Sequence, residues 1–258
     1  MSVFLHRMGV LSSSRFLPNK ISNLALWLDA ADSKTLFDAT SGGSLVAADG
    51  QVARWEDKSG NGRHVTQGTS AARPIRKVNS RNGLDTLDFT SFKYLSNVTS
   101  GEIDVKTVFL VIDYNRSLGV SGIPFGVARG ESGNSDYIGR PGGDVNSFYF
   151  RIGTGEYPIL SITGSPPSGF LLASLVSDGD TYGFFNGNSP LVTMLSHAGN
   201  LQIPYDRFFI GTRRQINDFF NRNIAEIVIY TRALTPTERR QVEEYLQEKW
   251  ATPALPEI

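Results

Sequence analysis

The two carboxylates Glu102 and Asp104 are the residues whose spacing comes nearest to a catalytic pair. Cleavage of a glycosidic bond uses two carboxyl groups, one as an acid and the other as a nucleophile or base. The pair precedes the apolar segment 107–113 and does not lie within this predicted strand. We therefore interpret Glu102 and Asp104 as part of a charged turn.

Other catalytic motifs that can be recognised by their spacing are missing from the sequence. It contains no G-x-S-x-G segment for a nucleophilic serine and no glycine-rich phosphate loop. His6, His64 and His197 are scattered, without the spacing of a zinc site. We therefore predict that the chain is not an enzyme.

Carboxylate and amide oxygens after the first apolar segment and in a glycine-rich turn could bind calcium, a hard cation that prefers oxygen ligands. The candidates are Asp29, Asp57 and Asn61, with Asp32, Asp178 and Asp180 as further oxygen donors. The alternative, which we favour, is that Asp57 and Asn61 hydrogen-bond their own backbone, as these residue types do in tight turns. We expect no cofactor, and calcium is the one alternative.

Binding of a glycan requires aromatic faces and planar polar side chains on an exposed surface. Trp27, Trp55 and Trp250 each lie within an apolar segment, so we expect all three to pack in the core. Glycine-rich loops supply better candidates, because loops carry most binding residues. The predicted binding residues are Tyr137, Arg140, Asp144, Asn146, Tyr149, Arg213, Asn217 and Asp218.

Many short apolar segments separated by turns predict an all-β domain. The segments Leu24–Asp29, Thr107–Asp113, Phe170–Val176 and Ile224–Tyr230 are apolar at nearly every position, as in strands that are covered on both faces. Asp-Gly and Asn-Gly pairs after residue 177 and at 186–187 predict hairpin turns. One helix is expected after Thr235, where Pro236 and Glu238 complete an N-terminal capping box.

Composition narrows the possible partners. The chain has 25 basic and 25 acidic residues, so nothing favours nucleic acid or an anionic membrane. It has no cysteine, which removes disulfides and thiolate metal sites. The N-terminal residues do not read as a signal peptide, and no apolar run approaches the length of a membrane span.

Several segments resemble laminin-G-like domains of the concanavalin A-like lectin/glucanase superfamily. These are the LALWLDAADSKTL opening, the segment Trp55-x-Asp57-x-Ser59-Gly60-Asn61-Gly62, the SDGDTYGFFNGN hairpin and the closing IAEIVIYTRALTPTER stretch. The resemblance spans about Leu24 to Trp250, and Arg222 stands where the family commonly has glycine. It implies a sandwich fold, but this fold carries lectins, hydrolases and interaction domains alike.

We therefore predict a two-sheet antiparallel jelly-roll sandwich with one C-terminal α-helix. Residues 1–20 form an N-terminal arm and residues 21–258 the sandwich. The expected function is that of a non-catalytic phage virion component, in a decoration, head-fibre or tail context, made in the host cytoplasm and homo-oligomeric. It would dock onto other virion subunits through residues 1–20 and recognise host surface glycans. The alternative is an extracellular bacterial carbohydrate-binding module or glucanase-like protein.

Overall fold

A computed structural model gives the fold of the chain. It describes residues 16–98, 103–114, 122–128, 135–140, 149–151, 169–178, 181–186, 189–196, 201–203, 207–213 and 218–252.

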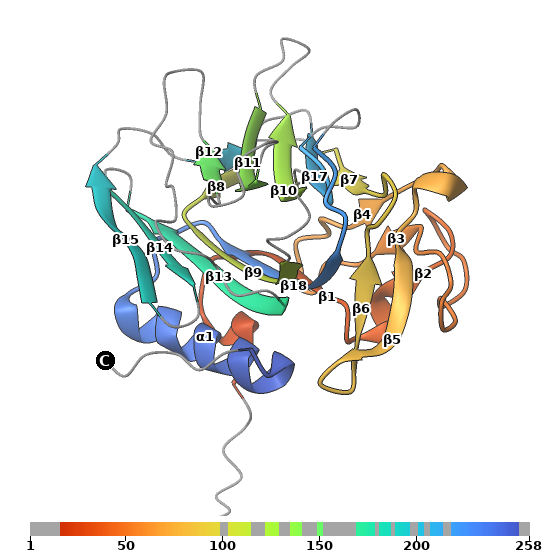
Figure 1. The fold of residues 1–258 in the computed structure, drawn as a ribbon, viewed down its shortest axis with the longest axis horizontal. Coiled ribbons are helices and arrows are strands. Elements are labelled where there is room, and N and C mark those ends of the chain that lie inside the picture. Colours follow the sequence, from red (N-terminus) through yellow and green to blue (C-terminus); the bar gives the residue numbers. More distant parts are fainter. Residues whose placement is uncertain are drawn as a thin grey trace, which may run out of the picture.

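Two antiparallel sheets are stacked to form a sandwich (Figure 1). The first sheet has the order β15 (Ser189–Ser196), β14 (Thr181–Asn186), β13 (Gly169–Ser177), β9 (Thr107–Tyr114), β18 (Asn223–Tyr230), β6 (Leu84–Asp88) and β5 (Ile75–Arg81), and β1 (Leu24–Asp29) also pairs with β18. The second sheet has the order β12 (Tyr149–Arg151), β11 (Ser135–Arg140), β10 (Gly122–Ala128), β17 (Arg207–Ile210), β7 (Leu95–Asn97), β4 (Val65–Thr66), β3 (Arg54–Trp55) and β2 (Leu36–Phe37). A small ribbon pairs β16 (Leu201–Ile203) with β8 (Ile103–Val105). The predicted fold class is confirmed.

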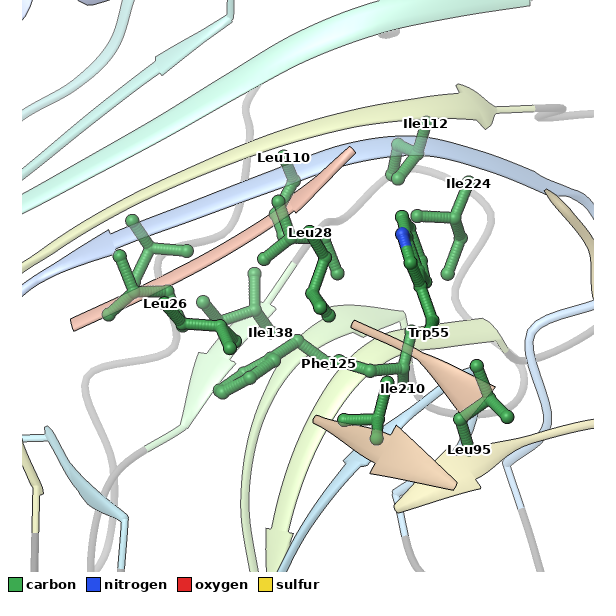
Figure 2. Close-up of a cluster of buried hydrophobic side chains, with 14 of the residues drawn as sticks. Leu26, Leu28, Trp55, Leu95, Leu110, Ile112, Phe125, Ile138, Ile210 and Ile224 are labelled. Carbon is green, nitrogen blue, oxygen red and sulfur yellow. The ribbon is translucent and has the colours of Figure 1, made fainter. Parts of the chain in front are cut away.

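The main core lies between the two sheets. Leu28 and Leu110 of the first sheet meet Phe125 and Ile210 of the second, and Trp55 fills the space beside them (Figure 2). All five side chains are at most 1% exposed. Burial of a large apolar side chain stabilises the fold by about 1.5–3 kcal/mol, so this layer supplies much of the stability.

A second core layer lies on the outer face of the first sheet, beneath the helix α1 (Pro236–Trp250), as Figure 1 shows. Thr235 Oγ1 accepts a hydrogen bond from the N–H of Glu238, whose carboxylate accepts one from the N–H of Thr235, so the predicted capping box is confirmed. Trp27 and Trp250 belong to this layer and are 3% and 0% exposed. The prediction that the three tryptophans pack in the core is therefore confirmed.

The turn η1 (Pro18–Lys20) forms the end of the predicted arm, residues 1–20, and contacts the sandwich. Tyr230 Oη donates a hydrogen bond of 2.8 Å to the carbonyl oxygen of Pro18, and the ring of Phe16 packs edge-on against Tyr245 of α1. Residues 16–20 therefore lie on the same layer as the helix, while residues 1–15 of the predicted arm lie outside the described residues. No helix in the described ranges is long and apolar enough to cross a membrane.

Candidate functional site

A charged cluster sits where α1 covers the first sheet. Glu226 lies in the middle of β18, and the register of the sheet places it directly opposite Asp29 of β1. Lys249 of α1 lies between the two carboxylates, with its Nζ 2.7 Å from Glu226 Oε2 and 2.6 Å from Asp29 Oδ1. Two carboxylates that are far apart in the sequence are thus held together by a single ammonium group.

Glu226 is fully buried and fully hydrogen-bonded. Its Oε1 accepts hydrogen bonds from Trp27 Nε1 at 2.7 Å and from Tyr245 Oη at 3.0 Å, and its Oε2 accepts one from Trp250 Nε1 at 2.6 Å. Burial raises the pKa of Glu226, the nearby charge of Asp29 raises it further, and Lys249 opposes both effects. With Lys249 as the fourth donor, the carboxylate has no free acceptor position for a ligand. Glu226 therefore positions the helix and its neighbours.

Asp29, a predicted calcium ligand, is surrounded by ammonium groups. Its Oδ2 lies 2.8 Å from Lys58 Nζ, which is also 2.8 Å from Asp32 Oδ2, and its Oδ1 accepts hydrogen bonds from Lys249 and from the N–H of Ala31. The Lys58 ammonium thus occupies the position between two carboxylates where a cation would bind. Burial is the largest single effect and lowers the pKa of Lys58. The charges of Asp29 and Asp32 and their hydrogen bonds with Lys58 together outweigh burial, so the pKa of Lys58 is raised above its ordinary value.

Asp57 and Asn61, the other predicted metal ligands, hold the glycine-rich turn against β1. Asp57 accepts hydrogen bonds from the backbone N–H groups of Trp27, Ser59 and Arg63, at 2.8–3.0 Å. Asn61 donates from Nδ2 to the carbonyl oxygen of Leu24 at 2.8 Å. The bonds from Ser59 and Arg63 are turn hydrogen bonds of the kind that the alternative expects, while those with Trp27 and Leu24 tie the turn to β1. Within the described ranges, no three histidine or acidic side chains are grouped so that they could hold a metal ion.

The second sheet brings several of the predicted binding residues together. Tyr137 of β11 is the register partner of Gly126 in β10 and of Arg151 in β12, while Arg140 and Tyr149 lie on the same two outer strands. A Cβ atom at Gly126 would lie 2.7 Å from the Cα of Arg213, so the absence of a side chain lets the loop after β17 approach β10. Arg213 forms an ion pair with Asp218, 3.7 Å apart. Asp144, Asn146 and Asn217 lie outside the described residues.

Beside this ion pair, three aromatic side chains form what we call the rim cluster: Phe92, Tyr94 and Phe219. The ring of Phe219, which follows Asp218 in the chain, packs edge-to-face on Phe92 with centroids 5.2 Å apart, and lies 6.3 Å from Tyr94. Phe92 is 69% exposed, and its contact with Phe219 makes it part of a contiguous aromatic surface, the kind of exposed apolar patch that often marks a binding site. The rim cluster therefore presents an aromatic surface next to an arginine and a carboxylate.

The backbone that carries Phe92 is strained. Ser91 and Phe92 have φ angles of +67° and +64°, in the left-handed region that bulky residues rarely adopt. The N–H of Ser91 donates to Asn221 Oδ1 at 3.2 Å, and the N–H of Thr90 donates to Asp88 Oδ1 at 2.8 Å, which fixes the turn. Strain of this kind costs of order 1–3 kcal/mol per residue and is concentrated at functional sites. The turn thus holds an aromatic ring in solvent at an energetic cost.

Sequence reasoning missed both the charged cluster and the rim cluster. A glutamate inside the apolar run IAEIVIY, and a lysine between Leu246 and Trp250 on the apolar face of the helix, were signals of a buried ion pair. Phe92 gave no such signal, because its exposure depends on a turn whose left-handed residues are not glycine.

Comparisons with known proteins show the fold. Neither the protein-family models nor the curated proteins contain a match to this chain. Among solved structures, Trypanosoma rangeli sialidase matches with a TM-score of 0.53 at 13% identity, over 90% of this chain and 34% of the sialidase chain. A GH54 α-L-arabinofuranosidase, soaked with 4-nitrophenyl α-L-arabinofuranoside, matches with a TM-score of 0.51 at 14% identity, over 78% of this chain and 52% of its own. The present chain thus spans only a third to a half of these structures.

These matches contradict the prediction that the chain is not an enzyme, because the solved structures that share its fold are a sialidase and an arabinofuranosidase. The prediction depended on a short linear motif, whereas a fold can bring carboxylates together from distant strands, as it does with Asp29 and Glu226. Of the pair considered in the sequence, Asp104 lies in β8, 3.6 Å from Lys106, and Glu102 lies outside the described residues. At these identities the likeness shows the fold, and the named activities are those of the matched proteins.

Proposed function

We propose that this chain is a glycan-binding β-sandwich domain of a glycan-active protein, and that it belongs to the concanavalin A-like superfamily that its sequence resembles. The proposal is supported by a fold shared with parts of a sialidase and of an arabinofuranosidase. The observation that supports a binding site is the rim cluster, in which the exposed ring of Phe92 packs on Phe219, the residue that follows Asp218 of the Arg213–Asp218 ion pair.

The chemistry of the rim cluster suits a sugar. One face of a sugar ring carries mainly C–H groups, which pack on an aromatic face, while its hydroxyl groups both donate and accept hydrogen bonds. Phe92 offers the aromatic face, and the exposed edge of the Arg213–Asp218 ion pair, whose side chains are 13% and 17% exposed, offers charged groups. Because the turn at Ser91 and Phe92 is already held by hydrogen bonds, little ordering is left to oppose binding.

A glycan array with the full chain, followed by titration of the best ligand, tests this proposal. Replacement of Phe92 with alanine should weaken binding about ten-fold, which corresponds to about 1.4 kcal/mol of lost stacking. Val98→Ala is the matched control, because Val98 is 72% exposed and apolar but lacks an aromatic face. Failure of the full chain to bind any glycan, or equal losses in both variants, would contradict the proposal.

The virion role, the docking of residues 1–20 onto other subunits, homo-oligomer formation and calcium binding stay predictions.

A further inference from the structure

A pocket of about 620 Å³ opens beside α1, within the size range of small-molecule sites. Its wall is built by five separate segments: the η1 turn with the residue before it, β1, the turn after β3 that carries Lys58, the hairpin between β5 and β6, and the C-terminal part of α1. Leu17 and Leu84 supply apolar surface, and Asp29, Lys58 and Lys249 supply charge. Figure 1 places α1 under the first sheet, away from β7 and β17, so this pocket is separate from the rim cluster.

The polar groups of the pocket are fixed before any ligand arrives. Lys249 Nζ has three acceptors within hydrogen-bond distance, namely Asp29 Oδ1, Glu226 Oε2 and Tyr245 Oη. Lys58 Nζ lies 4.5 Å from the centre of the Trp27 ring and is held by Asp29 and Asp32. Side chains held in this way do not have to be ordered when a ligand binds.

Lys58 and Asp29 each have one hydrogen-bonding position at the pocket wall beyond those that their protein partners use. An ammonium has three N–H groups, and Lys58 uses two of them on Asp29 and Asp32. A carboxylate accepts about four hydrogen bonds, and Asp29 accepts three, from Ala31, Lys58 and Lys249. In the part of the chain that the structure describes, one N–H of Lys58 thus has no hydrogen-bond acceptor besides the face of the Trp27 ring, one acceptor position of Asp29 is unused, and both residues line the pocket.

The charge of the wall distinguishes between ligand classes. The pocket lining carries two carboxyl groups, Asp29 and Glu248, and two ammonium groups, Lys58 and Lys249, so its formal charges cancel. Because both ammonium groups already contact carboxylates, an acidic sugar would add a negative charge without a cation left to balance it. Two neighbouring hydroxyl groups, by contrast, can accept from Lys58 and donate to Asp29 without adding charge.

We propose that this pocket is a second binding site, which takes a neutral sugar unit through two adjacent hydroxyl groups. This site is separate from the rim cluster, and the inference does not depend on whether the rim cluster binds a glycan.

The three tryptophans provide the test, because each gives one indole N–H signal in a ¹H–¹⁵N NMR spectrum. The full chain is titrated with L-arabinose and D-galactose as neutral probes, and with N-acetylneuraminic acid as the acidic probe. We expect at least one neutral sugar to shift the Trp27 signal saturably, with no shift at Trp55, which is buried in the other core layer. The acidic sugar should give no such shift.

Two variants locate the effect. Lys58→Met removes the donor, and Leu84→Phe fills the pocket without altering a charge, so each should abolish the shift of Trp27 while an unchanged Trp55 signal reports an intact fold. Phe92→Ala, which removes the rim cluster, should leave the shift unchanged. The inference is overturned if neither neutral sugar shifts the Trp27 signal, if the shift survives both pocket variants, or if the acidic sugar binds as well as the neutral ones.

Discussion

Replacement of Glu226 with glutamine tests the role assigned to the charged cluster. Glutamine keeps the size of the side chain but puts an NH₂ group where one carboxylate oxygen stood. In the native protein, each oxygen accepts from two donors: Trp27 and Tyr245 at Oε1, and Trp250 and Lys249 at Oε2. Whichever way the amide turns, two buried donors lose their acceptor and face another donor.

A buried donor without an acceptor costs about 1–3 kcal/mol, so the expected loss of stability for Glu226→Gln is about 3 kcal/mol. For a domain of this size, that corresponds to a fall in Tm of about 6–12 °C. Urea unfolding followed by tryptophan fluorescence measures the loss directly. Glu244→Gln is the matched control, because Glu244 is an exposed partner of Arg240 on the same helix and should change stability by less than about 0.5 kcal/mol. Equal effects of the two substitutions would refute the reasoning.

Two further predictions concern the same helix. Lys249→Met should cost about 3–5 kcal/mol, because it leaves Glu226 and Asp29 without the ammonium between them, and the double variant with Glu226→Gln should lose less than the sum of the single losses in urea unfolding. At the other end of the helix, Arg232 and then the N–H of Thr235 lower the pKa of Glu238 to about 2 from an ordinary value of 4.5. Because the pKa of Glu238 is lower in the folded chain, its contribution to stability is complete above pH 4.5 and disappears as the pH falls from 4.5 to about 2. The urea midpoint of Glu238→Gln should therefore vary less across that interval than the midpoint of the native chain. Equal variation of the two midpoints would contradict the assignment.

The long apolar strands and the helix could be predicted from the sequence because local chemistry alone specifies them. Leu24–Asp29 has the bounds of β1, and the Thr235 capping box begins α1. Strand β10 was missed, since Gly122, Pro124 and Gly126 read as a loop. Gly126 is there because the loop carrying Arg213 packs on it, a long-range contact that local propensity does not contain.

The sites were harder to predict because they depend on register and on turns. The pairing of Asp29 with Glu226 follows from the alignment of β1 with β18, and their shared ammonium comes from the helix. Arg213 and Asp218 were predicted as binding residues, and the structure places them together beside aromatic rings that the sequence did not single out. Residue types could therefore be recognised in advance, but their neighbours could not.

The most direct test of glycan binding at the rim cluster is an aromatic ¹H–¹³C NMR titration of the full chain with the best ligand from the glycan array. The account predicts that the ring signals of Phe92 and Phe219 shift together and saturably, and that the dissociation constant fitted to these shifts equals the one measured for binding. Unchanged ring signals at saturating glycan would contradict it.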